Sequence, residues 1–389
     1  MRPSLFALAA TAFLLGACAE PPKTSTPAAP PTTVTPSVGS PVTASGKTRI
    51  ALLLPLSGGA APIGQAMQQA AEMALFDTGA KDLALAAYDS GESAETAVEA
   101  YRKARTDGVA LVLGPLFGTS ARALAPLVSQ GGAKVVSFSN DETAAQPGVW
   151  IMGIAAPPQV RRVVDYSVDA GIKRFAAFAP RTSYGEQMVR TLESHVAVRG
   201  GTMAGVELYD PNSADLASSA QRLASAVKGD GKLAVLVPVA PPRLSAALAA
   251  LAAAGIDNKS AQFIGTGVWD VPNVGADAMT RGAWYAAPDP ARRADFERRF
   301  LATYGRPPNR LATLAYDGVA LAGNLARLKP GGDFSTEAIT NPNGWSGVDG
   351  IFRFLPDGRS ERALAVIEVQ SNRGVVVGPA PTTFTRPSN

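Results

Sequence analysis

A repeated alternation of short apolar segments and amphipathic segments constrains this chain more than any other feature of its sequence. Residues 50–54 form a continuous apolar run, and after a short loop Ile63, Met67 and Ala70 recur at the spacing of one helix face. Continuous apolar runs are typical of strands buried on both faces, as in parallel sheets covered by helices. The alternation therefore predicts an α/β fold built on parallel sheets.

The same unit recurs along most of the chain. The predicted strands cover residues 50–54, 83–88, 109–113, 134–137, 174–178, 202–208, 233–237, 262–264, 351–354, 363–369 and 375–377. The predicted helices cover residues 63–76, 93–105, 159–170, 184–198, 216–227, 243–254, 290–304 and 311–328, and another begins near Thr119. Open twisted sheets rarely exceed about ten strands, so two lobes of about four to six strands each fit better. A cleft between them would gather the carboxyl ends of the strands, where such folds bind ligands.

Residue counts exclude several classes of site. The 389 residues contain one cysteine and one histidine, which rules out an intramolecular disulfide, a zinc cluster and a multi-histidine metal site. His195 lies within a predicted helix without a glycine elbow, so we expect a surface or half-buried histidine rather than part of a catalytic triad. The net charge of +4 is spread along the chain, which argues against a nucleic-acid partner. No cofactor, metal or catalytic residue is expected.

The amino terminus has the pattern of a secretory signal. Residues 1–17 combine one positive charge, a short apolar run and small residues, and the run is too short for a permanent membrane helix. Cys18 follows Leu15-Gly16-Ala17, which resembles the bacterial lipobox of lipidated proteins; a chance cysteine after an ordinary signal is the alternative. We expect the acyl chains to hold the protein on a membrane.

A linker follows the cysteine. Residues 19–46 contain seven prolines and almost no large apolar side chain, so we expect residues 18–47 to be the lipidated cysteine and a disordered tether. The protein would face the periplasm of a bacterial envelope. By resemblance to enteric sorting rules, Ala19 favours the outer membrane over the inner one.

Several motifs, in this order along the chain, resemble those of type I periplasmic binding proteins of the leucine-binding group. They are residues 54–58 (LPLSG), 88–89 (YD), 114–115 (GP), 181–186 (RTSYGE), 316–318 (YDG) and 347–354 (GVDGIFRF). The resemblance covers about residues 48–380. It implies two doubly wound parallel-sheet lobes joined by a three-segment hinge, with crossings near Ala155, Tyr285 and Ala363.

The implied domain boundaries follow from these crossings. Lobe 1 would comprise residues 48–156 and 285–362, and lobe 2 would comprise residues 157–284 and 363–380. Residues 381–389 would form a flexible tail.

The resemblance also implies a set of residues that face the ligand cleft. These candidates are Ser57, Phe117, Thr119, Ser120, Ser139, Asn140, Tyr184, Thr266 and Asp270. Amino-acid binders of the family hold the ligand carboxylate with hydroxyl and backbone N–H groups after the third strand, and Tyr184 matches the tyrosine that covers the ligand. The carboxylate that pairs with the ammonium is absent at residues 265–267, and Asp270 is a shifted substitute. An unpaired buried ammonium costs several kcal/mol, roughly, which speaks against zwitterionic amino acids.

Two functions are compatible with this resemblance. One branch of the superfamily contains outer-membrane lipoproteins that activate penicillin-binding proteins, and Phe138-Ser139-Asn140 looks like that branch. We therefore expect a non-enzymatic, penicillin-binding protein activator-like regulator of peptidoglycan synthesis, whose partner would be a synthase. The alternative is the substrate-binding component of an ABC importer for amino acids or other small solutes, whose partner would be a permease. A hydrolase is disfavoured because the chain has no G-x-S-x-G elbow.

Two groups of side chains have alternative interpretations. Paired arginines such as Arg292 and Arg293 could contact partners, but such pairs are more often solvated helix faces. Trp269 and Trp284 could stack on a ligand near the hinge, or they could belong to the core.

Overall fold

The computed structural model describes residues 46–384 except residues 214 and 372. The predicted signal peptide, Cys18 and all but the last two residues of the predicted linker lie outside the described residues. So do residues 385–389 of the predicted tail. Within the described ranges, no helix combines the length and the apolar character that crossing a membrane requires.

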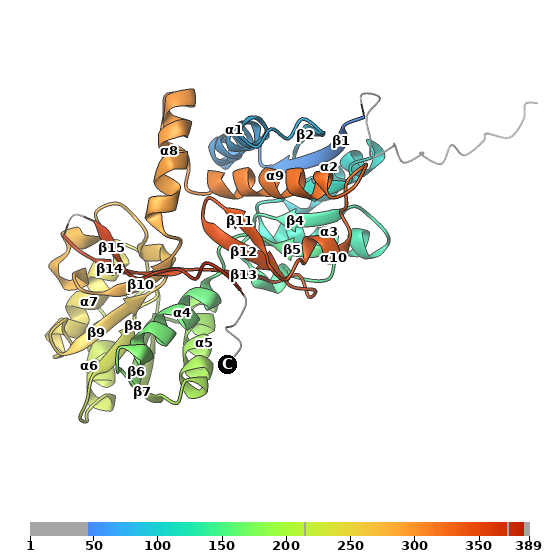
Figure 1. The fold of residues 1–389 in the computed structure, drawn as a ribbon. Helices are drawn as coiled ribbons and strands as arrows, with labels where there is room; N and C mark the ends of the chain where they lie inside the picture. Colours follow the sequence, from blue (N-terminus) through green and yellow to red (C-terminus); the bar gives the residue numbers. More distant parts are fainter. Residues whose placement is uncertain (1–45, 214, 372, 385–389) are drawn as a thin grey trace, which may run out of the picture. The chain divides into compact units, whose positions relative to one another are not determined.

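Lobe 1 is built on a five-stranded, fully parallel sheet (Figure 1). Its strands are β1 (Thr48–Leu54), β2 (Leu83–Asp89), β3 (Leu111–Leu113), β4 (Lys134–Ser137) and β5 (Val149–Ile151), in the order β2-β1-β3-β4-β5. Its helices are α1 (Ala61–Asp77), α2 (Ala94–Thr106), α3 (Gly118–Ser129) and α9 (Ala312–Arg327), and η1 (Glu142–Ala144) is a 3-10 turn. α1 and α9 cover one face of the sheet and α2 and α3 cover the other, each with its own buried apolar cluster.

Lobe 2 is built on a seven-stranded sheet in the order β15-β14-β10-β9-β8-β6-β7. Its strands are β6 (Arg174–Pro180), β7 (Thr202–Tyr209), β8 (Leu233–Leu236), β9 (Ala261–Gly265), β10 (Trp284–Ala287), β14 (Ala365–Val369) and β15 (Gly374–Gly378). Only β14 and β15 are antiparallel to their neighbours. α4 (Ala156–Asp169) and α5 (Ser183–Val198) cover one face, and α6 (Ala217–Ala226) and α7 (Arg243–Ala253) cover the other. The 3-10 turns η2 (Gly267–Trp269), η3 (Val274–Ala276) and η4 (Ala278–Thr280) connect β9 to β10.

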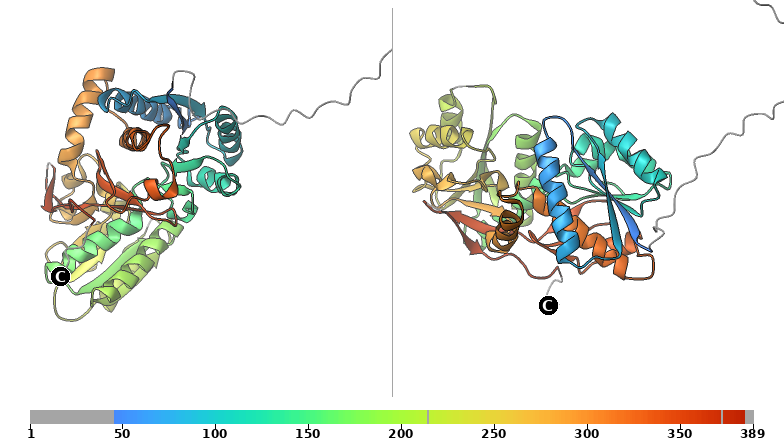
Figure 2. Two further views of the ribbon diagram at one scale, coloured as in Figure 1. Left: turned by 45° about the vertical axis from the view of Figure 1, so that its right-hand side comes forward. Right: turned by 90° about the horizontal axis from the view of Figure 1, so that it is seen from above.

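The remaining elements complete lobe 1 (Figure 2). α8 (Pro290–Tyr304) packs Phe296 and Phe300 against α1. After α10 (Thr336–Ile339), the strands β11 (Trp345–Gly347), β12 (Gly350–Phe354) and β13 (Ser360–Arg362) form a small antiparallel sheet. Phe352 and Phe354 of β12 join the apolar cluster beneath α9. The chain thus passes between the lobes after β5, after β10 and after β13.

These observations confirm the predicted α/β fold of two parallel-sheet lobes, with one correction to its boundaries. Lobe 1 was expected to resume at Tyr285, but Tyr285 lies inside β10, which pairs with β9 and β14 in the sheet of lobe 2. The second crossing therefore follows Ala287. The strands β5, β10, β11 and β13 were not predicted, because segments of three or four residues are too short to display a period. The equally short β3, β4 and β8 were predicted from their place in the alternation of strands and helices.

One close contact recurs at the first strand-to-helix connection of each lobe. Gly64 in the first turn of α1 lies against the carbonyl of Pro55, and a Cβ at this position would be 2.0 Å from that oxygen. Gly185 in the first turn of α5 lies against the carbonyl of Pro180, and a Cβ would be 2.1 Å from it. Only glycine permits this approach of helix to strand.

We expect Gly64→Ala and Gly185→Ala each to lower the free energy of unfolding by about 1–3 kcal/mol, because the backbone oxygen has to move away from the new methyl group. Urea denaturation followed by circular dichroism measures this loss. Gly59→Ala is the matched control, since its Cβ would lie 3.5 Å from the nearest atom, a side-chain oxygen of Glu92. Wild-type stability of both helix variants would contradict the packing argument.

Candidate functional site

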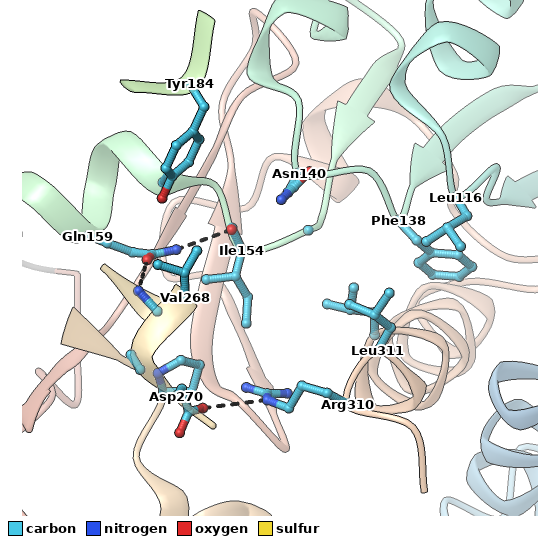
Figure 3. A pocket seen from close by; sticks show the side chains of 16 residues that line it. Leu116, Phe138, Asn140, Ile154, Gln159, Tyr184, Val268, Asp270, Arg310 and Leu311 are labelled. Atoms are coloured by element: carbon cyan, nitrogen blue, oxygen red, sulfur yellow. Dashed lines mark hydrogen bonds and ion pairs between the residues drawn. The ribbon is translucent and has the colours of Figure 1, made fainter. Parts of the chain in front are cut away.

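A cavity of about 270 Å³ lies where the two lobes meet (Figure 3). Lobe 1 and lobe 2 both line it, and the first two crossings form its back. The lining residues are Leu116, Phe138, Asn140, Gly153, Ile154, Ala156, Gln159, Tyr184, Gly267, Val268, Asp270, Ala287, Pro288, Arg310, Leu311 and Leu314. Because residues from both lobes surround the space, a molecule held there would contact both lobes at once.

The topology explains why these residues meet. Leu116 follows β3, Phe138 follows β4 and Val268 follows β9, so each belongs to a loop at the carboxyl end of a parallel strand. Tyr184 lies in the first turn of α5, and Leu314 lies in the first turn of α9. Parallel α/β sheets gather such loops and helix starts at one edge, and here the two edges face each other.

One wall of the cavity is apolar. Phe138 and Leu314 are buried in the core of lobe 1, and Leu116 is only 8% exposed. Leu311 packs against the same cluster, and Ile154 belongs to the apolar cluster beneath α4 and α5. This wall favours apolar ligand surface, whose removal from water is the main driving force for binding.

Tyr184 forms part of the polar wall together with Thr266. The Tyr184 hydroxyl and Thr266 Oγ1 share a hydrogen bond of 2.7 Å. Burial raises the pKa of Tyr184 and outweighs the opposite effect of this hydrogen bond, so the hydroxyl stays protonated at neutral pH. Thr266 is fully buried behind the tyrosine.

Gln159 of α4 connects the first crossing to the loop after β9. Its Oε1 accepts a hydrogen bond from the backbone N–H of Gly267, and its Nε2 donates to the carbonyl of Ala155 at 3.0 Å and to that of Ile154 at 3.3 Å. Both ends of the amide are therefore occupied by backbone groups (Figure 3). Gln159 fixes the shape of the cavity.

Asn140 differs from Gln159 because its side-chain amide forms no hydrogen bond with the described residues of the protein. It follows the buried Ser139, is exposed, and forms no side-chain hydrogen bond with the residues that the structure describes. The Ser139 hydroxyl, in contrast, accepts a hydrogen bond from the backbone N–H of Asp141 at 3.0 Å. Asn140 thus offers a donor and an acceptor to the cavity.

An ion pair joins the two lobes at one end of the cavity. Asp270 of lobe 2 lies 3.2 Å from Arg293 and 3.6 Å from Arg310, both of lobe 1. Burial and the neighbouring Asp270 carboxylate raise the pKa of Tyr285. Asp270 and Arg293 are largely buried, with side chains 17% and 13% exposed. Such a pair is screened less by salt than one on the surface.

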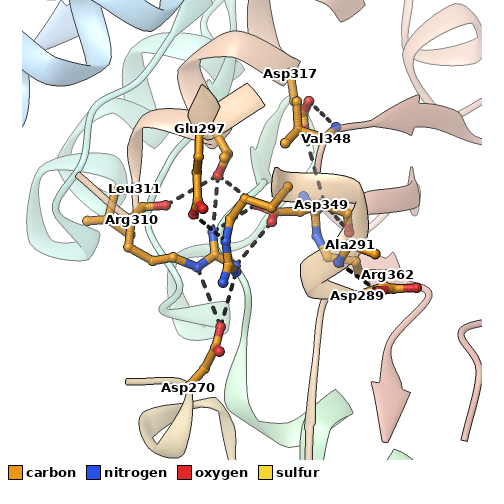
Figure 4. A network of polar contacts seen from close by, with 12 residues as sticks. Asp270, Asp289, Ala291, Glu297, Arg310, Leu311, Asp317, Val348, Asp349 and Arg362 are labelled. Carbon is orange, nitrogen blue, oxygen red and sulfur yellow. Dashed lines mark hydrogen bonds and ion pairs between the residues drawn. The ribbon is translucent and has the colours of Figure 1, made fainter. Parts of the chain in front are cut away.

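Arg310 connects this ion pair to a buried aspartate of lobe 1 (Figure 4). The Arg310 guanidinium lies 3.1 Å from both carboxylate oxygens of Asp349, and the Thr313 hydroxyl donates to Asp349 at 2.6 Å. Asp349 is fully buried. Burial acts to raise its pKa, but Arg310, Arg362 and these hydrogen bonds outweigh burial and hold the pKa below its usual value.

A second buried carboxylate brings two of the sequence motifs together. Asp317 of the YDG motif accepts a hydrogen bond from the backbone N–H of Val348 in the GVDGIFRF motif at 2.7 Å. Arg362 lies 3.9 Å from Asp317 and also donates to the carbonyls of Asp349 and Met152. Burial raises the pKa of Asp317 to about 7, with Asp349 contributing and Arg362 opposing.

The candidates predicted from the sequence divide into two groups. Asn140, Tyr184 and Asp270 line the cavity, and Thr266 and Ser139 lie directly behind it. The other four candidates, Ser57, Phe117, Thr119 and Ser120, are not among the lining residues. Ser57 and Thr119 are exposed, Phe117 packs against the core of lobe 1, and the Ser120 hydroxyl donates to the Ser93 carbonyl at 3.2 Å. A ligand contact by these four stays a prediction.

Several important residues gave no signal in the sequence. Gln159 lies in a predicted helix and Arg310 lies just before another. Neither residue belongs to a recognisable motif. Arg293 was expected on a solvated face, which is wrong because its side chain is largely buried against Asp270. Trp269 is fully buried and donates to the Val239 carbonyl at 3.0 Å, so it belongs to the core of lobe 2.

Residues 46–384, apart from 214 and 372, offer no cluster of three or more histidine, cysteine, aspartate or glutamate residues suited to a metal ion. His195 is half-buried in α5, where its Nε2 lies 2.7 Å from Asp165.

The sequence matches the family described as "Periplasmic binding protein" over residues 47–374. A solved protein of Rhodospirillum rubrum, assigned to a branched-chain amino acid ABC transporter, has a TM-score of 0.74 and 19% identity, covering 85% of this chain and all of that one (100%). A solute-binding protein of an ABC transporter from Rhodopseudomonas palustris BisB5, solved with 3,4-dihydroxybenzoic acid, has a TM-score of 0.60 and 17% identity, covering 87% of this chain and 97% of that one.

Two further relatives extend the comparison. The branched-chain amino acid transporter substrate-binding protein LivJ of Streptococcus pneumoniae, solved with isoleucine, has a TM-score of 0.59 and 16% identity, covering 86% of this chain and 100% of that one. An uncharacterized protein of Rickettsia prowazekii (strain Madrid E) is 22% identical over 163 residues, which are 42% of this chain and 43% of that protein. At these identities the solved structures establish the fold.

The raised pKa of Asp317 predicts how stability changes with pH. The pKa is about 7 in the folded protein against 3.8 for an ordinary aspartate, so the folded state binds the proton more tightly. The stabilisation from this proton is complete below about pH 4 and is lost as the pH rises through 7. We therefore expect the free energy of unfolding of the wild type, relative to Asp317→Asn, to fall between pH 5 and pH 8.

Urea denaturation at several pH values measures this difference. Asp257→Asn is the control, because hydrogen bonds from Ser260 and Lys259 keep the pKa of Asp257 below its usual value, outside this window. A pH-independent difference between wild type and Asp317→Asn would contradict the raised pKa.

Proposed function

This chain belongs to the periplasmic binding protein family, and from that premise we propose that it binds a small solute between its lobes as the substrate-binding component of an ABC importer. The observation that carries this proposal is the cavity lined from both lobes, with an apolar wall of Leu116, Phe138 and Leu314 and polar groups around it. Small-molecule sites have this character: mostly apolar, with few polar groups that fix orientation.

The connection between the lobes supports a role in which binding is coupled to lobe position. Ile154 and Pro288 of the first two crossings line the cavity, so the hinge is part of the binding surface. Asp270 and Arg310 contact each other across the lobes beside it. A ligand that contacts both lobes binds more tightly when the lobes are close together than when they are apart, so its binding favours the closed arrangement.

The solved relatives give further support. One was solved with isoleucine and another with 3,4-dihydroxybenzoic acid, so proteins of this fold hold small organic molecules. Each covers more than four fifths of this chain.

Filling the cavity should abolish solute binding. Val268 lines the cavity from lobe 2 and is half-buried, so Val268→Trp places an indole in the space. We expect a solute that stabilises the wild type in a thermal-shift screen and binds by calorimetry to lose at least 100-fold in affinity. Val271→Trp is the matched control, since Val271 is 40% exposed and does not line the cavity. Unchanged binding by Val268→Trp would place the site elsewhere.

We further propose that Cys18 carries a lipid anchor and that residues 19–46 tether the binding domain to the periplasmic side of the outer membrane. The support is the apolar run followed by Leu15-Gly16-Ala17 and the proline-rich composition after the cysteine. Two or more acyl chains suffice for stable anchoring.

Replacing the cysteine should release the protein. When cell envelopes are separated from soluble periplasm, we expect the wild type in the membrane fraction and Cys18→Ser in the soluble fraction, because the acyl chains have no attachment site. The conservative variant Ala19→Ser, adjacent to the cysteine, should stay with the membrane. Membrane retention of Cys18→Ser would contradict the anchor.

The sequence also suggested a regulator of peptidoglycan synthases. That hypothesis stays a prediction resting on residues 138–140, and the relatives described above are named for transport instead. Stimulation of a purified bifunctional synthase by this protein, unaffected by Val268→Trp, would favour the regulator over the importer component.

A further inference from the structure

We propose that the cavity takes an uncharged, largely apolar molecule with one hydrogen-bonding group, such as an aromatic or branched aliphatic amide, and discriminates against zwitterionic amino acids. This inference rests on the proposed solute-binding function and concerns the chemistry of the same cavity. Three observations carry it: the pairing of the charged lining residues, the apolar residues after β3 and β4, and one polar side chain of the lining that has no side-chain partner among the described residues.

The first observation is that both charged residues of the lining are already neutralised. Asp270 lies 3.2 Å from Arg293 and 3.6 Å from Arg310. A ligand ammonium beside Asp270 would therefore meet two guanidinium groups and no free carboxylate. Since an unpaired charge is costly to bury, the cavity disfavours cations.

The same pairing disfavours a ligand carboxylate. The Arg310 guanidinium lies 3.1 Å from the fully buried Asp349 and also faces Asp270. An incoming carboxylate would be the third negative group around one arginine. It would also have to displace a partner from a buried aspartate, which leaves that aspartate uncompensated.

The second observation is the character of the strand ends in lobe 1. Leu116 after β3 lines the cavity in the loop where the family resemblance led us to expect carboxylate-binding hydroxyl and backbone N–H groups, and Phe138 after β4 lines it as well. The Ser120 hydroxyl instead donates to the Ser93 carbonyl at 3.2 Å. Apolar side chains thus occupy the place of the expected donors, which suits a ring or a branched alkyl group.

The third observation concerns the polar groups. Both ends of the Gln159 amide bind backbone groups, and the Tyr184 hydroxyl is paired with Thr266. Asn140 has no side-chain partner among the described residues and lines the cavity. One free amide can satisfy one amide or hydroxyl of a ligand.

The volume of the cavity limits the size of the ligand. A cavity of about 150 Å³ accommodates benzene, so the observed volume of about 270 Å³ leaves room for a ring with a substituent.

Matched pairs of compounds test the inference. Calorimetry at pH 7 on the full chain carrying Cys18→Ser compares benzamide with benzoate, in which a carboxylate replaces the amide. It also compares 4-methylpentanamide with leucine, which has the same alkyl chain but carries a carboxylate and an ammonium group. We expect each amide to bind at least ten-fold more tightly than its charged counterpart. Tighter binding of leucine or benzoate would overturn the inference and leave the proposed function standing. Binding by none of the four would also overturn it, and the solute screen with Val268→Trp would then decide the proposed function separately.

Two variants test the residues behind this preference. Asp270→Asn removes one negative charge from beside Arg293 and Arg310, whose remaining carboxylate partners are Glu297 at 2.8 Å and Asp349 at 3.1 Å. The site gains one unit of positive charge, so we expect the ratio of benzoate to benzamide affinity to rise at least ten-fold. Asn140→Ala removes the free amide and should weaken benzamide about five- to ten-fold, whereas Asn212→Ala, exposed and outside the lining, should not. An unchanged ratio in a folded Asp270→Asn variant would overturn the charge argument. If that variant does not fold, the wild-type pairs and Asn140→Ala still decide the inference.

Discussion

Carboxylate and guanidinium groups of alternating sign extend from the core of lobe 1 to the loop after β9 in lobe 2. Asp317 and Asp349 are buried, Arg362 lies between them, and Arg310 connects Asp349 to Asp270 across the lobes. Each of these groups would be costly to bury alone, so each requires its neighbour in place. The geometry of the cavity depends on these pairs, because Arg310 lines the cavity and also neutralises the buried Asp349.

The hinge is tied into the same network. Arg362 ends β13 just before the third crossing, and it donates to the carbonyl of Met152 just before the first crossing. Gln159 holds the first crossing to the loop after β9. Two of the three connecting segments are therefore positioned by polar side chains, and the second lines the cavity through Ala287 and Pro288. A molecule in the cavity would therefore contact the first two connecting segments directly.

The balance of charge explains how a protein of this fold can differ from its amino-acid-binding relatives without losing the cavity. The fold fixes which loops meet, but the ligand is selected by what those loops present. Here Leu116 and Phe138 stand at the strand ends, and Asp270 is already paired with Arg293 and Arg310.

The alternation of apolar runs and helical periods determined the α/β class, the parallel sheets and most of the helices, because each of these signals is local. The order of the motifs pointed to the lobes, and Asn140, Tyr184 and Asp270 were identified by position. The sequence could not reveal that Arg293 is buried, that Arg310 bridges two aspartates, or that β10 belongs to lobe 2. These facts depend on residues 20 to 80 positions apart meeting in space, and ion pairing and strand pairing over such separations leave no periodic trace in the chain. Only the tertiary structure decided which charges cancel, and hence what the cavity can hold.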